Sequence, residues 1–246
     1  IAGREGATVI FSVTPEILNK YAHLDVPKKH ILHGVTDEFL AALRNASMPR
    51  QNGKIQVGYS GNFLRPDMDH AVFLQIIREN PEVQFHCWGS YKAGDSNVGG
   101  GQGISNSVTN FVQQLQDMPN VKMYGVVASN TLAQHLASMN AFMICYDINK
   151  DQSKGTNYHK IMEYVATGKV VISNNVTNYK DRPDLVQMPA SRENNKELPQ
   201  LFKQVINNLA EYNSEQLRST RMQYAADNTY SKHLDEIEAV LQKLSP

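Results

Sequence analysis

The stretch TNYHKIMEYVATGKVVIS, residues 156–173, predicts a short helix that leads directly into a buried strand. The helix is expected over Asn157–Thr167, Gly168 ends it, and a β-branched run forms the strand. Positions three and four apart are neighbours on a helix, so the apolar residues share one face that packs on a sheet. The opposite face carries Lys160 and Glu163. A helix packed through one face on a strand is the building block of α/β folds.

Outward from this stretch, strand-like and helix-like runs alternate along most of the chain. The strand-like runs are short and apolar without alternation, as in parallel strands that are covered on both faces. Amphipathic helices are predicted between them, for example over Pro66–Glu79 and Thr131–Met139. The alternation predicts an α/β fold with a doubly wound, Rossmann-like parallel sheet. The predicted strands are Thr8–Ser12, His30–Leu32, Lys54–Tyr59, Val83–Trp88, Val121–Tyr124, Ala141–Cys145, Val170–Ser173 and Leu185–Met188.

The chain changes character after Pro189, where only helices are predicted. These C-terminal helices are expected over Glu197–Tyr212, Ser214–Ala226 and Ser231–Leu244, and we expect them to cover the sheet. The polar, glycine-rich segment Lys92–Ser107 lacks the third glycine of a phosphate-binding loop and trails its strand. It is therefore interpreted as a mobile surface loop.

A cluster of turn residues in ASMPRQNG, residues 46–53, predicts a domain boundary. Residues 1–45 are interpreted as the trailing βαβα segment of an N-terminal domain, or as a linker. Residues 46–246 are predicted to form one Rossmann-like domain. Because the chain begins with Ile1, we expect it to be part of a longer protein.

The composition is that of an ordinary globular protein. The 24 Lys and Arg residues balance the 24 Asp and Glu residues, so no overall charge favours nucleic acid or an acidic membrane surface. Cys87 and Cys145 lie in apolar strand-like runs, which indicates reduced, buried thiols and a cytoplasmic protein. No spacing of His and Cys matches a metal site, and no apolar run approaches the roughly 20 residues of a membrane helix.

Lys160 and Glu163 place a cation and an anion near the start of the predicted helix. A helix N-terminus attracts phosphate through its amides and dipole, and Gly155 lets the chain approach an anion closely. Lys160 adds a full positive charge, and Glu163 can accept two hydrogen bonds from the hydroxyls of a ribose. The alternative is a plain surface ion pair, which stabilises a helix by only about 0.2–0.5 kcal/mol. The spacing by itself leaves both interpretations open.

Three other segments place glycine or polar residues at strand ends, where α/β folds bind ligands. In VGYSGNFLRP, Gly61 occupies a tight turn and Arg65 the loop that follows. In VKMYGVV, the backbone of Val126 and Val127 can contact the edge of a base. His33, at the end of HILH, either faces a cleft or is a structural histidine.

Taken in order, these segments resemble the C-terminal half of GT-B glycosyltransferases, mainly the family-4-like retaining group. YHKIMEYVATGKVVIS is similar to the family's K-x-x-E-Y-x-A-x-G-K-x-V-[IV] signature. VIFSVTPEIL, ILHGVTDEF, VGYSGNF, PEVQFHCWGS and NVKMYGVVASNTLAQHLASMNAFMI match in the same order, so the resemblance covers about Val9 to Tyr230. It implies two facing Rossmann-like domains, of which residues 46–246 would be the one that binds a nucleotide sugar.

The resemblance also implies roles for individual residues. Glu163 is expected to bind the ribose of the donor, and Lys160 the diphosphate together with Arg65. Two departures from the family pattern are Gly155, where many relatives carry a second glutamate, and Tyr158, where a proline is common. The remaining substrate-binding residues are expected beside the phosphates, the base or the domain hinge, and they are Gly61, Asn62, Gly155, Thr156, Asn157, Val126, Val127 and His33.

The activity implied by the resemblance is transfer of a sugar from a nucleoside-diphosphate sugar, with UDP or GDP as the most expected nucleotide. The acceptor is left open, within polysaccharide or glycoconjugate synthesis, and nucleic acid is not expected as a partner. No cofactor or metal is expected, because cationic side chains and helix N-termini would stabilise the leaving group. A missing N-terminal domain would supply the acceptor site, the catalytic base and any contact with a membrane surface. This portion alone is therefore expected to be weakly active or inactive.

Two alternatives stay open at this point. One is a non-catalytic α/β module that binds nucleotides or has a regulatory role. The other is a sugar-nucleotide epimerase with the same fold, which would need further acids and histidines at its cleft.

Overall fold

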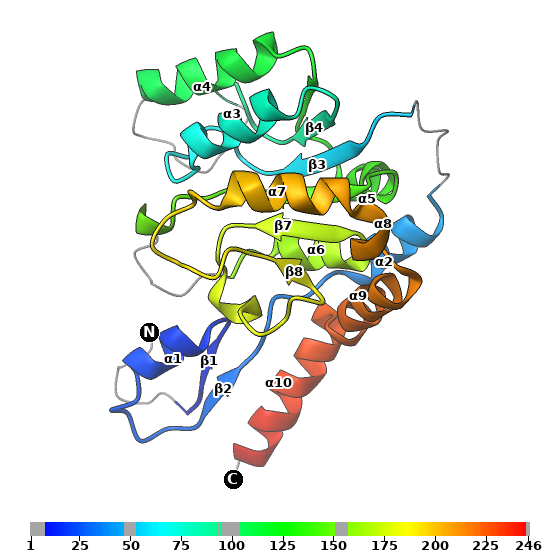
Figure 1. The fold of residues 1–246 in the computed structure, drawn as a ribbon. Helices are drawn as coiled ribbons and strands as arrows, with labels where there is room; N and C mark the ends of the chain where they lie inside the picture. Colours follow the sequence, from blue (N-terminus) through cyan, green and yellow to red (C-terminus); the bar gives the residue numbers. More distant parts are fainter. Residues whose placement is uncertain (1–7, 47–52, 93, 95–103, 151–156, 245–246) are drawn as a thin grey trace.

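The computed structural model describes residues 8–46, 53–92, 94, 104–150 and 157–244. These residues contain a parallel sheet of six strands in the order β5-β4-β3-β6-β7-β8, with helices on both faces (Figure 1). The prediction of an α/β fold with a doubly wound parallel sheet is confirmed. The strands are β3 Gln56–Ser60, β4 Gln84–Trp88, β5 Val121–Gly125, β6 Ala141–Ile144, β7 Val170–Ser173 and β8 Val186–Gln187.

The order of the strands creates a switch point between β3 and β6. From β3 the chain moves outward through β4 to β5, then returns to β6 and moves the other way through β7 to β8. The connections that leave β3 and β6 therefore diverge. In such sheets the carboxyl ends of the two central strands border a crevice.

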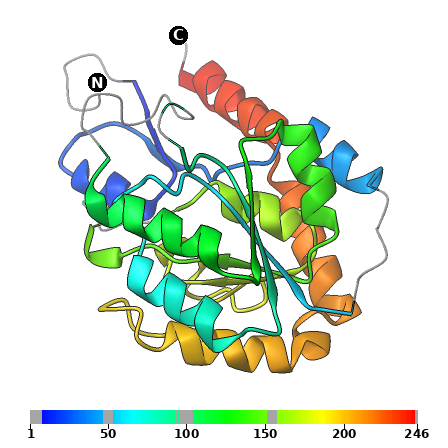
Figure 2. The ribbon, with the colours of Figure 1, turned by 90° about the horizontal axis from the view of Figure 1, so that it is seen from above.

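The helices divide between the two faces of the sheet. On one face α3 (His70–Glu79) packs against α7 (Leu198–Asn207). On the other face α5 (Ser129–Ala137) packs against α2 (Asp37–Arg44), while α6 (Lys160–Ala166) packs against α9 (Glu215–Asp227). Figure 1 shows α7 in front of β7 and α6 behind it, and Figure 2 gives the view from above.

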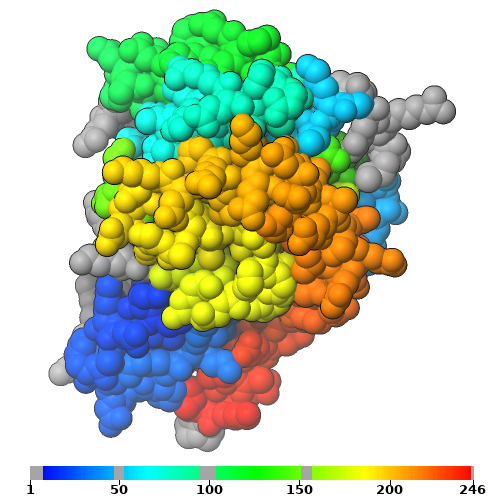
Figure 3. Space-filling view, in the orientation of Figure 1, coloured from blue at the N-terminus to red at the C-terminus, as the bar shows by residue number. Residues whose placement is uncertain are grey.

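The N-terminal segment is a small unit beside this sheet. It consists of β1 (Ile10–Ser12), α1 (Pro15–Lys20), β2 (Lys28–His30) and α2, and β1 pairs with β2 in parallel. Strand β2 lies two residues earlier than predicted, because Lys28 is the residue that pairs with Ile10. In Figure 3 the dark blue surface of β1, α1 and β2 lies below the body that carries the large sheet, whereas α2 packs against α5. The order β-α-β-α is the expected one, whereas its assignment to a second domain stays a prediction.

The N-terminal segment and the C-terminal helices meet at Val35. The Val35 amide donates to Asn228 O at 3.1 Å, and the Tyr230 amide donates to Val35 O at 3.1 Å. A side chain at Gly34 would lie 2.7 Å from the Tyr230 nitrogen, so this close crossing requires glycine. The crossing lies between α9 and α10 (Tyr230–Leu244).

The last helix does not cover the sheet, contrary to the prediction. Among the described side chains of α10, only His233 is buried, and Leu234 is 59% exposed. Instead α10 runs beside β2, where Glu236 forms an ion pair with Lys29 at 2.8 Å (Figure 1). The predicted helix Glu197–Tyr212 is also divided at Asn208 into α7 and α8 (Leu209–Tyr212).

Helix α3 begins at His70, four residues later than predicted. The Asp69 carboxylate caps it by accepting from the Val72 amide, and Asp67 O accepts from the Asp147 amide at 2.8 Å. Residues 66–69, which were predicted to form the first turn of the helix, therefore form a loop that is held by these tertiary contacts.

Helix α4 (Asn106–Asp117) was not identified in the sequence, although it buries Val108, Phe111, Val112 and Leu115 at helical spacing. Residues 93 and 95–103 of the expected loop Lys92–Ser107 lie outside the described residues.

Arg221 ties α9 to the ends of two other elements. Its side chain is fully buried, and the guanidinium donates to Gly168 O, Tyr212 O and Asp184 O at 2.8–3.2 Å. Gly168 and Tyr212 lie where α6 and α8 end, so a cation meets carbonyl groups at the negative ends of helix dipoles. This contact fixes α9 behind the helix that carries Lys160.

We expect Arg221→Met to lower the free energy of unfolding by about 2–4 kcal/mol, because it leaves buried carbonyl groups without donors. Urea denaturation followed by circular dichroism measures the change. Arg218→Met, at an exposed position on the same helix, is the matched control. A loss no larger than that of the control would contradict the expectation.

Candidate functional site

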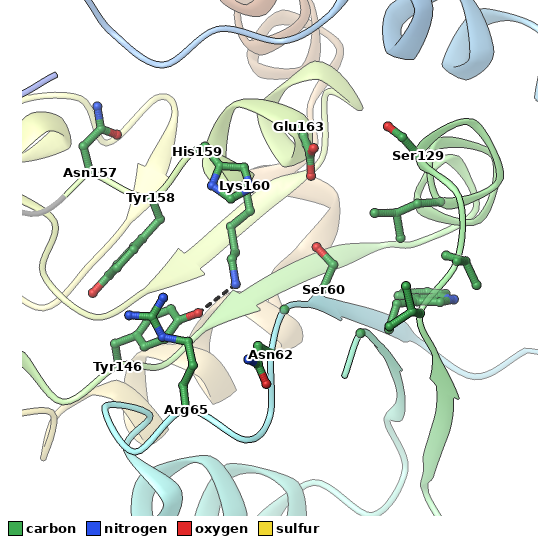
Figure 4. A pocket seen from close by; sticks show the side chains of 16 residues that line it. Ser60, Asn62, Arg65, Ser129, Tyr146, Asn157, Tyr158, His159, Lys160 and Glu163 are labelled. Carbon is green, nitrogen blue, oxygen red and sulfur yellow. Dashed lines mark hydrogen bonds between the residues drawn. The ribbon is translucent and has the colours of Figure 1, made fainter. Parts of the chain in front are cut away.

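A cavity of about 620 Å³ opens at the carboxyl ends of the central strands (Figure 4). Its walls come from the loops after β3, β4, β5 and β6 and from the start of α6, so it lies at the switch point of the sheet. The predicted site residues that line it are Glu163, Lys160, Arg65, Gly61, Asn62, Val126, Val127 and Asn157. Gly155 and Thr156 lie outside the described residues.

Lys160 is the first residue of α6 and is only 7% exposed. Among the described residues no carboxylate forms an ion pair with it. Its Nζ donates to the Tyr146 hydroxyl at 2.8 Å and lies 4.7 Å and 5.1 Å from the ring centres of Tyr59 and Tyr146. A buried ammonium held by a phenol and two aromatic faces is not the plain surface pair considered from the sequence.

Gly61 gives the ammonium its space. A side-chain carbon at Gly61 would overlap the Nζ of Lys160 and lie 2.9 Å from the Tyr59 hydroxyl. A larger residue at this position would therefore displace the lysine ammonium, which the turn alone did not reveal.

The loop after β3 is fastened to the loop after β4. The Gly61 amide donates to Trp88 O at 2.8 Å, and the Phe63 amide donates to Ser90 O at 2.9 Å. Gly89 has φ +121°, and a side chain there would overlap the Gly61 carbonyl. Gly89 was not predicted as a site residue, although a glycine after a buried strand was a signal for it.

Glu163 lies one turn beyond Lys160 and lines the same cavity, as Figure 4 shows. Burial raises the pKa of the Glu163 carboxyl to about 7, although the nearby charge of Lys160 opposes the rise. Near neutral pH this carboxyl therefore changes its charge readily. It can meet a ligand as an acceptor of two hydrogen bonds or, when protonated, as a donor.

Arg65 borders the cavity with part of its charge already balanced. Its Nε donates to the Asp67 carboxylate at 2.8 Å and its terminal nitrogen to the second oxygen of that carboxylate. This hydrogen bonding raises the pKa of the guanidinium further. The guanidinium lies 5.7 Å from the ring centre of Tyr146, so it can approach an anion held by Lys160.

The other end of the cavity is apolar. Val126, Val127 and Leu132 line it together with Trp88, and Val126 is 63% exposed. The indole of Trp88 stacks on the ring of Tyr124, with ring centres 5.2 Å apart, and is thereby fixed. This end offers flat apolar surface and loop backbone instead of charge.

His33 is not among the residues that line the cavity. Its ring contacts that of His159, with centres 6.1 Å apart, and it hydrogen-bonds to the Asn157 backbone. Desolvation lowers the pKa of His33 and of His159, which favours the neutral form of both rings. Asn157 lines the cavity, but its side-chain amide donates to Val13 O at 3.1 Å and so ties the N-terminal segment to the site.

Several lining residues were missed in the sequence. They come from strand ends, from the first turns of α5 and from the turn before α6. They are Ser60, Trp88, Gly89, Ser129, Leu132, Tyr146, Tyr158 and His159.

In the described part of the chain, no three His, Cys, Asp or Glu side chains are grouped so that they could hold a metal ion. Asp67 and Asp69, which have DxD spacing, are used by Arg65 and by the cap of α3. No helix among the described residues has both the length and the apolar character needed to span a bilayer.

Comparison with solved structures gives the same fold. Sucrose-phosphate synthase from Thermosynechococcus elongatus matches 98% of this chain and 59% of its own, with 13% identity and a TM-score of 0.70. Anabaena HepE in complex with UDP and glucose matches 96% of this chain and 63% of its own, with 14% identity and a TM-score of 0.66. The pneumococcal O-GlcNAc transferase GtfA in complex with UDP and GlcNAc matches 97% and 45%, with 14% identity and a TM-score of 0.59.

These neighbours are GT-B glycosyltransferases, so the structural resemblance to that class is confirmed. The chain spans less than two thirds of the length of each of them. At this identity the likeness establishes the fold alone. The sequence matches no protein-family model and no curated protein.

We expect the raised pKa of Glu163 to lower stability as the pH rises. Between about pH 4.5 and 7 the folded protein keeps a proton that the unfolded chain loses, so the free energy of unfolding falls and then levels off. Glu163→Gln removes this contribution and should be the more stable protein at pH 8 by about 2 kcal/mol, with little difference at pH 4.

Urea denaturation at both pH values measures the difference. Glu82→Gln, at an exposed glutamate, is the control. It should change the free energy of unfolding by the same amount at pH 4 and at pH 8. An equal effect of Glu163→Gln at both pH values would show that the carboxyl is not desolvated.

Proposed function

We propose that this chain is the donor-binding portion of a glycosyltransferase that transfers a sugar from a nucleoside-diphosphate sugar, with UDP or GDP as the nucleotide, to an acceptor. The observation that carries the proposal is the buried ammonium of Lys160 in the switch-point cavity, without a described carboxylate partner. Burying a charge is costly unless an opposite charge compensates it. An anionic ligand beside Gly61 and Asn62 supplies that compensation.

The rest of the cavity fits the other parts of a nucleotide. Glu163 lies one turn from Lys160, a position that suits a vicinal diol attached to a phosphate bound by the lysine. The apolar end at Val126 and Val127 fits a base that is read by backbone groups. The structural neighbour HepE has a complex with UDP-glucose, which supports the same class of ligand here.

The chemistry of transfer asks mainly for a stabilised leaving group. When the glycosidic bond to the diphosphate breaks, negative charge grows on the diphosphate oxygens. Among the described lining residues, Lys160 and Arg65 are the cations that can face this charge. We further propose that residues 46–246 form the nucleotide-sugar domain and that residues 1–45 belong to a second domain, which brings the acceptor and the catalytic base.

The two alternatives make different demands. An epimerase needs further acids and histidines at its cleft, whereas the described residues that line this cavity include one acid, Glu163, and one histidine, His159. A non-catalytic module would bind the nucleotide and never transfer the sugar. Two buried free thiols favour a cytoplasmic location, and we propose a role there in polysaccharide or glycoconjugate synthesis.

Calorimetric titration with UDP, GDP, ADP and inorganic pyrophosphate tests the binding proposal. We expect UDP or GDP to bind, and Lys160→Met to weaken both the nucleotide and pyrophosphate by at least tenfold, because it removes a charge-assisted contact. Glu163→Gln should weaken the nucleotide severalfold and leave pyrophosphate unchanged, because only the nucleotide carries a ribose.

Lys169→Met is the matched control, since Lys169 lies in the same stretch but does not line the cavity. It should bind like the wild type. A wild-type protein that binds no nucleotide, or an equal loss in both lysine variants, would refute the proposal. Binding without any transfer by the longer protein would favour the non-catalytic module.

A further inference from the structure

Tyr146 lies at the centre of the charged end of the cavity. It follows β6, is only 4% exposed, and its hydroxyl accepts a hydrogen bond from Lys160 Nζ at 2.8 Å. The Tyr59 hydroxyl lies 3.2 Å away on the other side. Figure 4 shows the Tyr146 hydroxyl turned toward Lys160, close to Arg65 and Asn62.

The hydrogen bonds around Tyr146 leave its own proton available. A phenol has one O–H and two lone pairs, and Lys160 uses one lone pair because an ammonium can only donate. The Tyr59 O–H faces the Tyr146 oxygen at 3.2 Å and the sulfur of Met68 at 3.6 Å, and an oxygen is the better acceptor. Tyr146 then accepts twice, and among the described residues no further acceptor contacts its O–H.

An anion in the cavity would fix the direction of the hydrogen bond between the two phenols, with Tyr59 as the donor and Tyr146 as the acceptor. Without a ligand, Tyr59 can turn to Met68 and accept the Tyr146 proton. A phosphate oxygen beside Lys160 is a much stronger acceptor than either a neutral phenol or a thioether, because the bond is charge-assisted. The Tyr146 proton therefore turns to the anion and the Tyr59 proton turns to Tyr146.

The surroundings also make Tyr146 a strong donor. Burial by itself would raise the pKa of Tyr146, but the charge and hydrogen bond of Lys160, the hydrogen bond from Tyr59 and the charge of Arg65 together lower it. Burial raises the pKa of Tyr59, which keeps that phenol protonated. The ring of Tyr158 lies 4.5 Å from that of Tyr146 and shields one side of it.

We propose that Tyr146 donates its phenolic O–H to the same phosphate group that Lys160 binds, with Tyr59 as a positioning residue behind it. This rests on the proposed function, because the anion is taken to be the diphosphate of a nucleotide sugar. A neutral donor beside the two cations contributes more as charge grows on the leaving diphosphate, so Tyr146 acts on the transfer step as well as on binding.

Tyr146→Phe and Tyr59→Phe form a matched pair for the test. Each variant removes one of the two hydroxyls that hydrogen-bond to each other. Of the two tyrosines, only Tyr146 lines the cavity. Calorimetric titration with inorganic pyrophosphate and with UDP should give at least fivefold weaker binding for Tyr146→Phe. Tyr59→Phe should lose no more than about twofold, and thermal unfolding of each variant checks that it is folded.

A second comparison separates direct donation from a role through Lys160. In a Lys160→Met background, titrated with pyrophosphate in the millimolar range, Tyr146→Phe should still weaken binding severalfold. The proposal would be overturned if Tyr146→Phe bound pyrophosphate with wild-type affinity, or if the two phenylalanine variants lost affinity equally. It would also be overturned if Tyr146→Phe did not weaken binding in the Lys160→Met background.

The outcome also distinguishes this inference from the proposed function. A protein that binds pyrophosphate but no nucleotide would refute the proposed function, while the pyrophosphate series still decides the role of Tyr146. A wild-type protein that binds neither ligand would overturn both.

Discussion

The site depends on one interaction, the enclosure of the Lys160 ammonium between the rings of Tyr59 and Tyr146. Among the described residues, the contacts of this buried cation are one phenol and two π-faces, which compensate its charge poorly. The protein tolerates this arrangement because the remaining side of the ammonium faces an open cavity. The burial that makes this ammonium costly is therefore also the basis of the affinity for an anion that is proposed above.

The backbone around this lysine is arranged to keep the space free. Gly61 makes room for the ammonium, and Gly89 makes room for the carbonyl of Gly61. The two loops that carry these glycines leave neighbouring parallel strands, so the sheet register sets their distance. Behind α6, the buried Arg221 binds the carbonyl of Gly168 just past the end of that helix. The lysine is thus positioned from both ends of its helix.

The small N-terminal unit is connected to the same region. Val35 pairs with the crossing between α9 and α10, and Asn157 reaches Val13 from the wall of the cavity. The rings of His33 and His159 also contact each other in this region, and desolvation lowers the pKa of both. Any displacement of the N-terminal unit would therefore be felt at the start of α6.

The sequence by itself determined the parallel α/β sheet, because the alternation of apolar runs and amphipathic helices is a local pattern that can be identified without knowledge of tertiary contacts. It also marked Lys160, Glu163, Gly61, Asn62 and Arg65, which stand at strand ends and at a helix start where ligands bind. Only the tertiary structure decided that Lys160 is buried with no carboxylate partner in the described part of the chain, that Tyr146 meets it, and that α10 leaves the sheet. The reason is physical: burial, pKa and hydrogen-bond partners depend on residues far apart in the chain, such as Tyr59 and Lys160, whose approach no local pattern encodes.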